Sequence, residues 1–236
     1  MKILTILPTL NEETNIKILY KQIIATKLKM DLYFNDDGSK DNTVSYINKL
    51  KNKKKNFKIY LNKRKQRLGI GRAHKDGLLF AYKKKYDLAI TMDTDLAHNP
   101  KYFSKLLSLI QNNDLVIGSR FLKKNSTPKW SLFRVFLRNS SHLFTKLLFK
   151  HNFDGTNSFR CYKLKNIKKT FLNYTPDHYD FFFTSLAILN KRKYSIKEFP
   201  MVVYGRSHGS SNMELRHIIR SIIMIFIFYL KLFFIK

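Results

Sequence analysis

Short apolar runs alternate with longer amphipathic patterns along the first half of the chain, and this alternation is the feature that most restricts the fold. It predicts strands near residues 2–7, 32–35, 57–61, 88–92 and 115–118, and helices near 13–26, 41–51, 73–85, 101–111 and 132–149. Strands that alternate with helices imply parallel pairing through right-handed crossovers. The sequence therefore predicts an α/β fold, whose ligands bind beyond the carboxyl ends of the strands.

The length and the cysteine content suit one intracellular domain. A chain of 236 residues is large enough for a single α/β core, with little left over. The lone Cys161 excludes an intrachain disulfide and a cysteine-based metal cluster, which fits a reducing cytosol. The apolar run after Lys2 spans only five residues before Pro8, so we interpret it as a first strand and not as a secretory signal.

The charge balance predicts an anionic partner. Forty-five Lys and Arg against sixteen Asp and Glu give a formal net charge of +29. Such a field attracts nucleic acid, an acidic membrane surface or phosphorylated substrates. The lysine runs at 53–55 and 83–85 are equally typical of solvated surface.

The C-terminal segment differs from the rest of the chain. Residues 218–235 are almost wholly apolar, interrupted by Arg220, Ser221 and Lys231. A membrane-spanning helix needs about 20 apolar residues, so this segment is marginal. We expect a helix that lies in or dips into the membrane interface; a short span and a buried packing helix are the alternatives.

Two carboxylates follow the fourth predicted strand. The run 88–92 ends in Asp93 and Asp95, one residue apart, and the chain then turns. Carboxylates at this spacing can share a hard cation such as Mg²⁺ or Mn²⁺, which takes its other ligands from water and substrate phosphates. The pair indicates an enzyme that handles a nucleotide diphosphate, although two solvated acids at a strand end would look the same.

Two further segments follow strands or open helices. Asp37 and Gly38 lie in an Asp-Asp-Gly-Ser turn, where a fixed carboxylate could bind a nucleobase or ribose and where an ordinary capped turn is the alternative. Gly69 and Gly71 precede a helix whose first amides favour an anion. His74, on that helix, is predicted to be a surface or packing residue.

Arginines are the third group of candidates. Guanidinium groups bind phosphate through two parallel hydrogen bonds, which lysine cannot do. Several of them near a metal-bound diphosphate could hold a second, phosphorylated substrate; the candidates are Arg120, Arg134, Arg138, Arg160 and Arg206.

These segments together resemble one enzyme family in content and order. The motifs are Pro8-Thr-Leu-Asn-Glu12, Asp36-Asp-Gly-Ser, Leu68-Gly-Ile-Gly, Met92-Asp-Thr-Asp-Leu-Ala-His-Asn-Pro100, Ile117-Gly-Ser-Arg120, Gly155-Thr-Asn-Ser-Phe-Arg160 and Glu198-Phe-Pro200. The chain resembles family 2 glycosyltransferases over residues 2–212, specifically the dolichyl-phosphate mannosyltransferase branch and its bacterial polyprenyl-phosphate relatives.

The resemblance implies a fold and a domain division. The fold is expected to be the Rossmann-like GT-A type, a three-layer α/β/α arrangement with a mostly parallel mixed sheet. Residues 1–212 would form the glycosyltransferase domain, and residues 213–236 a membrane-associated apolar helix.

The resemblance also assigns roles to individual residues. It implies a divalent cation, Mg²⁺ or Mn²⁺, held by Asp93 and Asp95, and acceptor-phosphate binding by Arg138 and Arg206. Asp95 and Arg120 would be catalytic. The residues implied to bind the nucleotide sugar are Pro8, Leu10, Glu12, Asp37, Asp93, Thr94, Asp95 and Arg120.

The implied reaction is inverting transfer of mannose or a similar hexose from a nucleotide-diphosphate sugar to polyprenyl phosphate, at the cytoplasmic face of a membrane and with no nucleic-acid partner. The chain departs from the branch pattern at Ala97, Thr184 and Asn212. Ala97 removes one possible metal ligand, and Thr184 stands where a carboxylate is common.

Two alternatives stay open at this stage. A transferase of the same fold could act on a sugar hydroxyl, which needs a carboxylate base, and Asp177 or Asp180 falls in the appropriate region. A basic membrane- or nucleic-acid-binding protein would use the charge without catalysis, but no stacking-platform motif such as an RNP signature is present.

Overall fold

The computed structural model describes residues 1–52, 56–128, 130–205 and 215–232, so that Arg206 and Asn212 lie outside the described residues. Within that part of the chain, one seven-stranded sheet has the order β3-β2-β1-β4-β6-β5-β7. Its strands are β1 (Ile3–Thr9), β2 (Asp31–Asp36), β3 (Ile59–Lys63), β4 (Leu88–Thr91), β5 (Leu115–Ser119), β6 (Arg160–Lys163) and β7 (Ile196–Pro200).

Up to residue 149 the helices alternate with these strands, as the pattern predicts. They are α1 (Glu13–Ala25), α2 (Thr43–Lys51), α3 (Ile70–Lys83), α4 (Phe103–Leu109), α5 (Leu132–Phe149), α6 (Phe181–Lys191) and α7 (Leu215–Leu232). Short 3₁₀ turns occupy Pro100–Tyr102, Ile110–Asn112 and Lys169–Tyr174.

The sheet is mixed because one late strand is inserted in reverse. β1 pairs in parallel with β2 and β4, β2 with β3, and β5 with β7, whereas β6 runs antiparallel between β4 and β5. The predicted mostly parallel mixed sheet is therefore confirmed.

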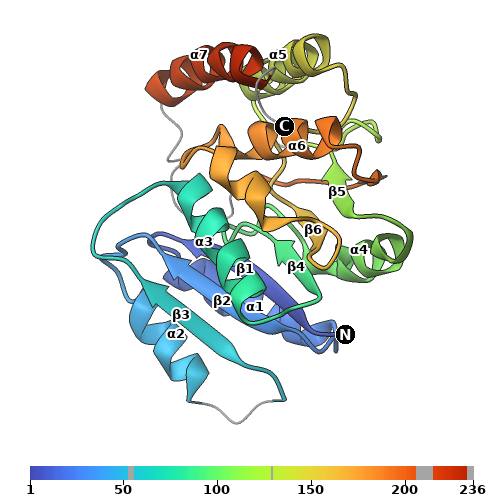
Figure 1. Ribbon diagram of the computed structural model, residues 1–236. Helices are drawn as coiled ribbons and strands as arrows, with labels where there is room; N and C mark the ends of the chain where they lie inside the picture. Colours follow the sequence, from blue (N-terminus) through green and yellow to red (C-terminus); the bar gives the residue numbers. More distant parts are fainter. Residues whose placement is uncertain (53–55, 129, 206–214, 233–236) are drawn as a thin grey trace.

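Side chains on alternate positions of the strands build two cores. Leu4 and Ile6 pack in the cluster that contains α3 and α6, whereas Ile3 and Leu7 pack in the cluster that contains α1, α2 and α4. Figure 1 shows the corresponding three layers, with the sheet in the middle. The three-layer GT-A arrangement expected from the resemblance is confirmed.

The last two strands and α6 lack the periodic patterns that reveal the others. β6 is four residues long and begins and ends with the basic residues Arg160 and Lys163. β7, at the edge of the sheet, has two adjacent charged residues, Lys197 and Glu198, which interrupt the alternation expected of a strand. α6 is buried on all sides from Phe181 to Leu189, so it has no polar face to mark a helical period.

Helices α5 and α7 lie side by side on the outer side of α6 (Figure 1). In α7, Ile225 and Phe228 are buried in the same cluster as α6, whereas Ile223, Phe226 and Leu230 are exposed. The helix thus packs on the domain through one face and leaves an apolar face uncovered. None of the helices in the described part of the chain has the length and apolar character needed to span a bilayer.

Candidate active site

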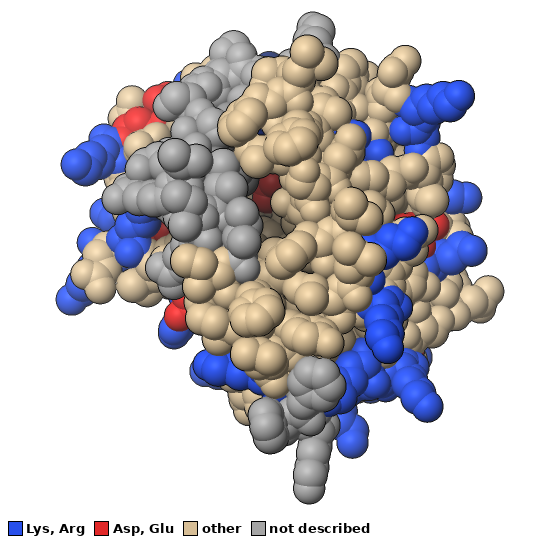
Figure 2. Space-filling view, turned by 90° about the horizontal axis from the view of Figure 1, so that it is seen from above, with Lys and Arg blue, Asp and Glu red and all other residues tan. Residues whose placement is uncertain are grey.

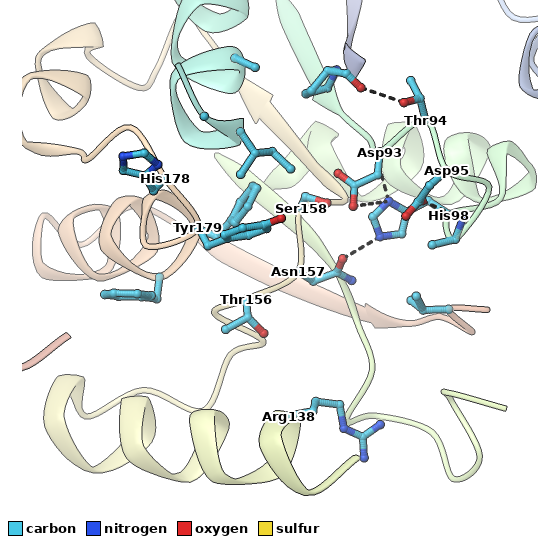
Figure 3. A pocket seen from close by; sticks show the side chains of 18 of the residues that line it. Asp93, Thr94, Asp95, His98, Arg138, Thr156, Asn157, Ser158, His178 and Tyr179 are labelled. Atoms are coloured by element: carbon cyan, nitrogen blue, oxygen red, sulfur yellow. Dashed lines mark hydrogen bonds and ion pairs between the residues drawn. The ribbon is translucent and has the colours of Figure 1, made fainter. Parts of the chain in front are cut away.

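A cavity of about 730 Å³ lies at the carboxyl ends of the central strands. This volume is in the range of small-molecule sites. Its wall is contributed by the ends of β1, β2, β4 and β5, the segment before β6, and helices α5, α6 and α7. Figure 3 shows this arrangement, with Arg138 on α5 across the cavity from Asp93 and Asp95. Nearly all predicted site residues are therefore brought together; Arg206 lies outside the described residues.

The loop after β4 is tied to β1 and to itself. Thr94 Oγ1 donates to the carbonyl of Pro8 at 2.8 Å, and the amide of Ala97 donates to Asp95 Oδ1 at 3.1 Å. Leu96 has φ of 66°, a left-handed conformation that a leucine adopts only when its surroundings impose it. The tight turn holds Asp93 and Asp95 at the cavity wall.

His98 connects this loop to the segment before β6. The amide of Asp93 donates to His98 Nδ1 at 3.2 Å, so that nitrogen carries no proton. The proton of the neutral ring is then on Nε2, which lies 3.0 Å from Asn157 Oδ1 and donates to it. The 3.8 Å separation of His98 Nδ1 from Asp93 Oδ2 is consequently not an ion pair.

His74 lies against the other side of Asp93. Its side chain is fully buried, and Nε2 is 4.0 Å from Asp93 Oδ1. Burial lowers the pKa of His74 to about 3, assisted by the charge of Arg160, so the ring is neutral. It packs edge-on against Phe182 at 5.0 Å, which makes it a packing residue, as the sequence predicts. Two neutral imidazoles therefore flank Asp93, and neither ring supplies a charge that would neutralise it.

The donor set at this position fits a cation that also binds substrate. No group of three or more His, Cys, Asp or Glu side chains within the described residues could hold a metal by protein ligands alone. Mg²⁺ and Mn²⁺ are commonly held by one or two carboxylates with phosphate and water completing the shell. Asp93 and Asp95 match that pattern.

The residues predicted to bind the nucleoside line one end of the cavity. Pro8 lies at the end of β1, Leu10 and Glu12 follow that strand, and Asp37 follows β2. Asp37 Oδ1 accepts from the amide of Leu68 at 2.9 Å and from Arg64 Nη1 at 2.8 Å. Sequence reasoning missed Arg64, because an arginine one residue past a strand carries no pattern of its own.

The glycine segment before α3 packs closely against another part of the chain. Gly69 has φ of 99°, and a Cβ on it would lie 2.6 Å from the carbonyl oxygen of Asp177. The amide of Arg72 donates to the same carbonyl at 2.9 Å. The close approach that these glycines permit is therefore between two parts of the chain, and the Arg72 amide is occupied by Asp177. Gly69 and Ile70 line the cavity, so the expectation that the start of this helix favours an anion stays a prediction. The packing of Gly69 and Gly71 fixes the segment that presents His178 and Tyr179 to the cavity.

Arg120 is held by a partner that the sequence did not reveal. Its Nε and Nη2 donate to the two oxygens of Asp154 at 2.8 and 2.6 Å. Burial alone would raise the pKa of Asp154, but the adjacent Arg120 guanidinium holds that pKa below its ordinary value. Arg120 also lines the cavity. Its guanidinium is thus oriented by a buried carboxylate at the cavity wall.

The other arginines divide into two groups. Arg134 and Arg138 line the cavity from α5, where Arg134 stacks on Trp130 at 4.9 Å and Arg138 donates to Thr127 Oγ1 at 2.8 Å. Burial, together with the charge of Arg120, lowers the pKa of Arg138. Arg160 is fully buried, so the prediction that it could bind phosphate is wrong.

Glu198 on β7 supports the Arg120–Asp154 pair from behind, because its Oε1 accepts the amide of Asp154 at 2.5 Å. Burial raises the pKa of Glu198 from 4.5 to about 7. A pKa that is raised in the folded state favours folding below pH 4.5, and this contribution is lost as pH rises to about 7.

The variant Glu198→Gln keeps the acceptor oxygen and removes the ionisation. We expect it to gain about 3 kcal/mol of stability over the parent at pH 8, and almost nothing at pH 4.5. Urea unfolding of both proteins across this range measures the difference. A stability difference that does not change with pH would contradict the assignment.

The sheet topology and the strand-end cavity, with paired carboxylates facing arginines, are those expected of a GT-A glycosyltransferase. Comparison with known proteins agrees with this class. Residues 5–171 match the sequence model of Glycosyl transferase family 2, and the chain belongs to that family.

Curated relatives match over nearly the whole chain. The sequence is 26% identical to an undecaprenyl-phosphate mannosyltransferase of Micrococcus luteus over 91% of this chain and 88% of that protein. It is also 26% identical to a polyprenol monophosphomannose synthase of Mycolicibacterium smegmatis, over 89% of this chain and 80% of that protein.

Solved structures share the fold at lower identity. Glucosyl-3-phosphoglycerate synthase of Mycobacterium tuberculosis, solved with Mn²⁺ and UDP, superposes with a TM-score of 0.69 at 17% identity, covering 100% of this chain and 81% of that one. A mannosyltransferase of Pyrobaculum calidifontis, solved with GDP-Man and Mn²⁺, gives a TM-score of 0.58 at 16% identity, covering 89% of this chain and 58% of that one.

Proposed function

We propose that this protein transfers a hexose, mannose in the first instance, from a nucleotide-diphosphate sugar to polyprenyl phosphate. The observation that carries the proposal is the distribution of charge along the cavity. Its acidic lining residues are Glu12, Asp37, Asp93 and Asp95, all from the loops after β1, β2 and β4. The wall formed by α5, α6 and the end of β5 contributes arginines and, among the described residues, no carboxylate.

The absence of a carboxylate from that wall discriminates between acceptor classes. Transfer to a hydroxyl needs a base to take its proton, whereas a phosphate is already ionised near neutral pH. Neither Asp177 nor Asp180, the alternatives for a base, lines the cavity. Asp177 instead accepts from Lys75 Nζ at 3.1 Å, and Thr184 is buried within α6. The arginine wall favours a phosphate acceptor.

Different residues are proposed to bind the sugar donor and the phosphate acceptor. Pro8, Leu10, Glu12 and Asp37 hold the nucleoside, and Thr94 fixes the loop that carries Asp93 and Asp95. These two carboxylates hold Mg²⁺ or Mn²⁺, which when bound neutralises the donor diphosphate as it departs. An oxygen of the acceptor phosphate attacks the anomeric carbon, the bond to the diphosphate breaks, and the configuration inverts.

Arginines supply the electrostatic stabilisation on the acceptor side. Arg120, oriented by Asp154, lines the same cavity, where its charge would offset the repulsion between two anions. Arg138 and the neighbouring Arg134 bind the acceptor phosphate from α5. Arg206 is proposed for the same role on the basis of the sequence alone.

Transfer into the lipid fraction tests this proposal directly. Purified protein is incubated with Mn²⁺, polyprenyl phosphate and labelled GDP-mannose or UDP-glucose, and the lipid is extracted. We expect label in a lipid-soluble, mild-acid-labile product. Label in a soluble saccharide would favour the hydroxyl-acceptor alternative. Salt-sensitive binding of nucleic acid without binding of either nucleotide would indicate a non-catalytic protein.

We further propose that α5 and α7 dock the enzyme on an anionic bilayer. The outer face of α5 is strongly apolar: Leu132 is 88% exposed and Phe136 65% exposed, and Phe133, Leu143 and Leu147 are also exposed. The exposed apolar residues of α7 extend this face. Figure 2, seen from above, shows mostly uncharged side chains around a hollow, with lysines and arginines toward the margin.

Charge and position favour a bilayer over a second copy of the chain. Lys146 and Lys150 lie on or directly after α5 and are exposed, so the apolar face is bordered by cations that attract anionic headgroups. Leu137, Phe144 and Ile225 of the same helices line the cavity, which links it to the docking face. A polyprenyl phosphate could therefore enter from the membrane without crossing water. The division at residue 212 remains a proposal, because α7 also contributes to the core.

Replacing Phe133 and Phe136 by serine should weaken binding to vesicles containing anionic lipid by at least about tenfold, since each exposed aromatic loses its transfer into the interface. Vesicle co-sedimentation measures this loss. Leu79→Ser, which removes an exposed apolar residue from α3, is the matched control. Unchanged sedimentation together with loss of a dimer on gel filtration would assign the face to self-association.

A further inference from the structure

Ser158 carries a buried hydroxyl that the proposed mechanism does not use. Its side chain is 3% exposed, and Oγ finds no hydrogen-bond partner among the described residues. It also lines the cavity (Figure 3). A buried hydroxyl is normally paired, so an unpaired one on a residue that lines a ligand cavity points to a polar group of the ligand.

The backbone around Ser158 fixes its place on the cavity floor. Thr91 Oγ1, at the end of β4, donates to the carbonyl of Ser158 at 2.5 Å. The next carbonyl, that of Phe159, accepts the amide of Gly118 on β5 at 3.0 Å. Ser158 therefore lies between the strand that leads to Asp93 and the strand that leads to Arg120.

That place corresponds to one part of the reactants. In any direct transfer, the anomeric carbon lies between the departing diphosphate and the attacking phosphate. With the diphosphate at Asp93 and Asp95 and the acceptor phosphate at the arginines of α5, the hexose ring lies over the floor between β4 and β5. A sugar hydroxyl both donates and accepts hydrogen bonds, as the serine hydroxyl does.

We propose that Ser158 binds a hydroxyl of the donor hexose and is a specificity-determining residue for the sugar. The inference rests on the proposed function, since it assigns the sugar subsite of the same cavity. Ser158 Oγ is already buried in the protein without a ligand. Binding therefore adds a hydrogen bond to this hydroxyl without first stripping water from it. A donor that lacks the matching hydroxyl loses this contact.

Calorimetric binding of GDP-mannose and of GDP, each with Mn²⁺, tests the assignment without requiring turnover; UDP-glucose and UDP form a second pair. Ser158→Ala should bind the preferred nucleotide sugar about five- to tenfold more weakly and the matching nucleoside diphosphate equally well. Deoxy-sugar analogues of the donor sharpen the result, because the analogue without the contacted hydroxyl should bind parent and variant alike.

Ser104→Ala, on the exposed surface of α4, is the control for the substitution itself. Equal loss of nucleotide-sugar and nucleoside-diphosphate affinity in Ser158→Ala would overturn the assignment in favour of a structural role. Unchanged affinity for both would overturn it as well. Failure of the unaltered protein to bind any of these nucleotides would instead reject the proposed function together with this inference.

Discussion

Asp95→Asn should reduce sugar transfer by about 10²–10³-fold and abolish the dependence of donor binding on Mn²⁺. Asp95 lies beside Asp93 at the end of the central strand, and the pair provides the acidic charge at the centre of the cavity. Replacing one carboxylate by a neutral amide weakens the hold on the cation, which is the main stabiliser of the departing diphosphate. Initial rates and nucleotide titrations with and without Mn²⁺ measure both effects.

Glu13→Gln is the matched control for this prediction. It removes one carboxylate from the start of α1, outside the cavity lining, where Glu13 forms an ion pair with Lys17 four residues on. Its rate should stay close to that of the parent. Full activity in Asp95→Asn, or an equal loss in both variants, would remove the metal-site assignment.

Arg160→Met should destabilise the fold by about 3 kcal/mol or more. The buried guanidinium donates to the carbonyls of Asn157, Phe182 and Gly155 at 2.8–2.9 Å. Methionine fills a similar volume but takes this donor from the carbonyls of Asn157 and Gly155, whereas that of Phe182 still accepts from Ser185 Oγ at 2.9 Å. Each unsatisfied buried group costs about 1–3 kcal/mol. Urea and thermal unfolding at fixed pH measure the loss.

The prediction separates a structural arginine from a phosphate-binding one. Arg192→Met, in which the guanidinium lies at the surface near Tyr174, is the control and should change stability little. If Arg160→Met were as stable as the parent and instead lost acceptor affinity, the phosphate role that the sequence suggested would be restored.

The first part of the fold could be predicted because each of its elements has a simple period. Strands β1 to β5 and helices α1 to α5 fall within a few residues of their predicted places. The same regularity located Asp93 and Asp95, the two carboxylates proposed to bind the cation, since parallel strands bring their carboxyl ends to one edge of the sheet. The late elements follow no such rule. β6 joins the sheet between two strands that precede it by about 40 to 70 residues, and because it begins and ends with a charged residue, it lacks the apolar run that marks the other strands.

The candidate site was predictable in its residues and not in their partners. Pro8, Asp37, Asp93 and Arg120 all line the cavity, as motif positions suggested. What the sequence could not give was the pairing of Arg120 with Asp154. That contact, like the one between His98 and Asn157, depends on the insertion of β6, which no local pattern encodes. Their roles in binding and catalysis remain predictions that the variants test.

The reversed strand β6 also has a consequence for the order in which the protein folds. During synthesis, β4 and β5 emerge early, but they are not neighbours in the described sheet, because β6 lies between them. The neighbours of β5 in that sheet are β6 and β7, and both are synthesised after it. A nascent chain that ends near residue 150 can therefore complete the sheet β3-β2-β1-β4 while β5 still lacks both partners. Residues 156–160, which carry the floor of the cavity, arrive afterwards. The donor side of the site, on the loops after β1, β2 and β4, can thus form before the floor at residues 156–158, which completes the cavity in a late step of folding.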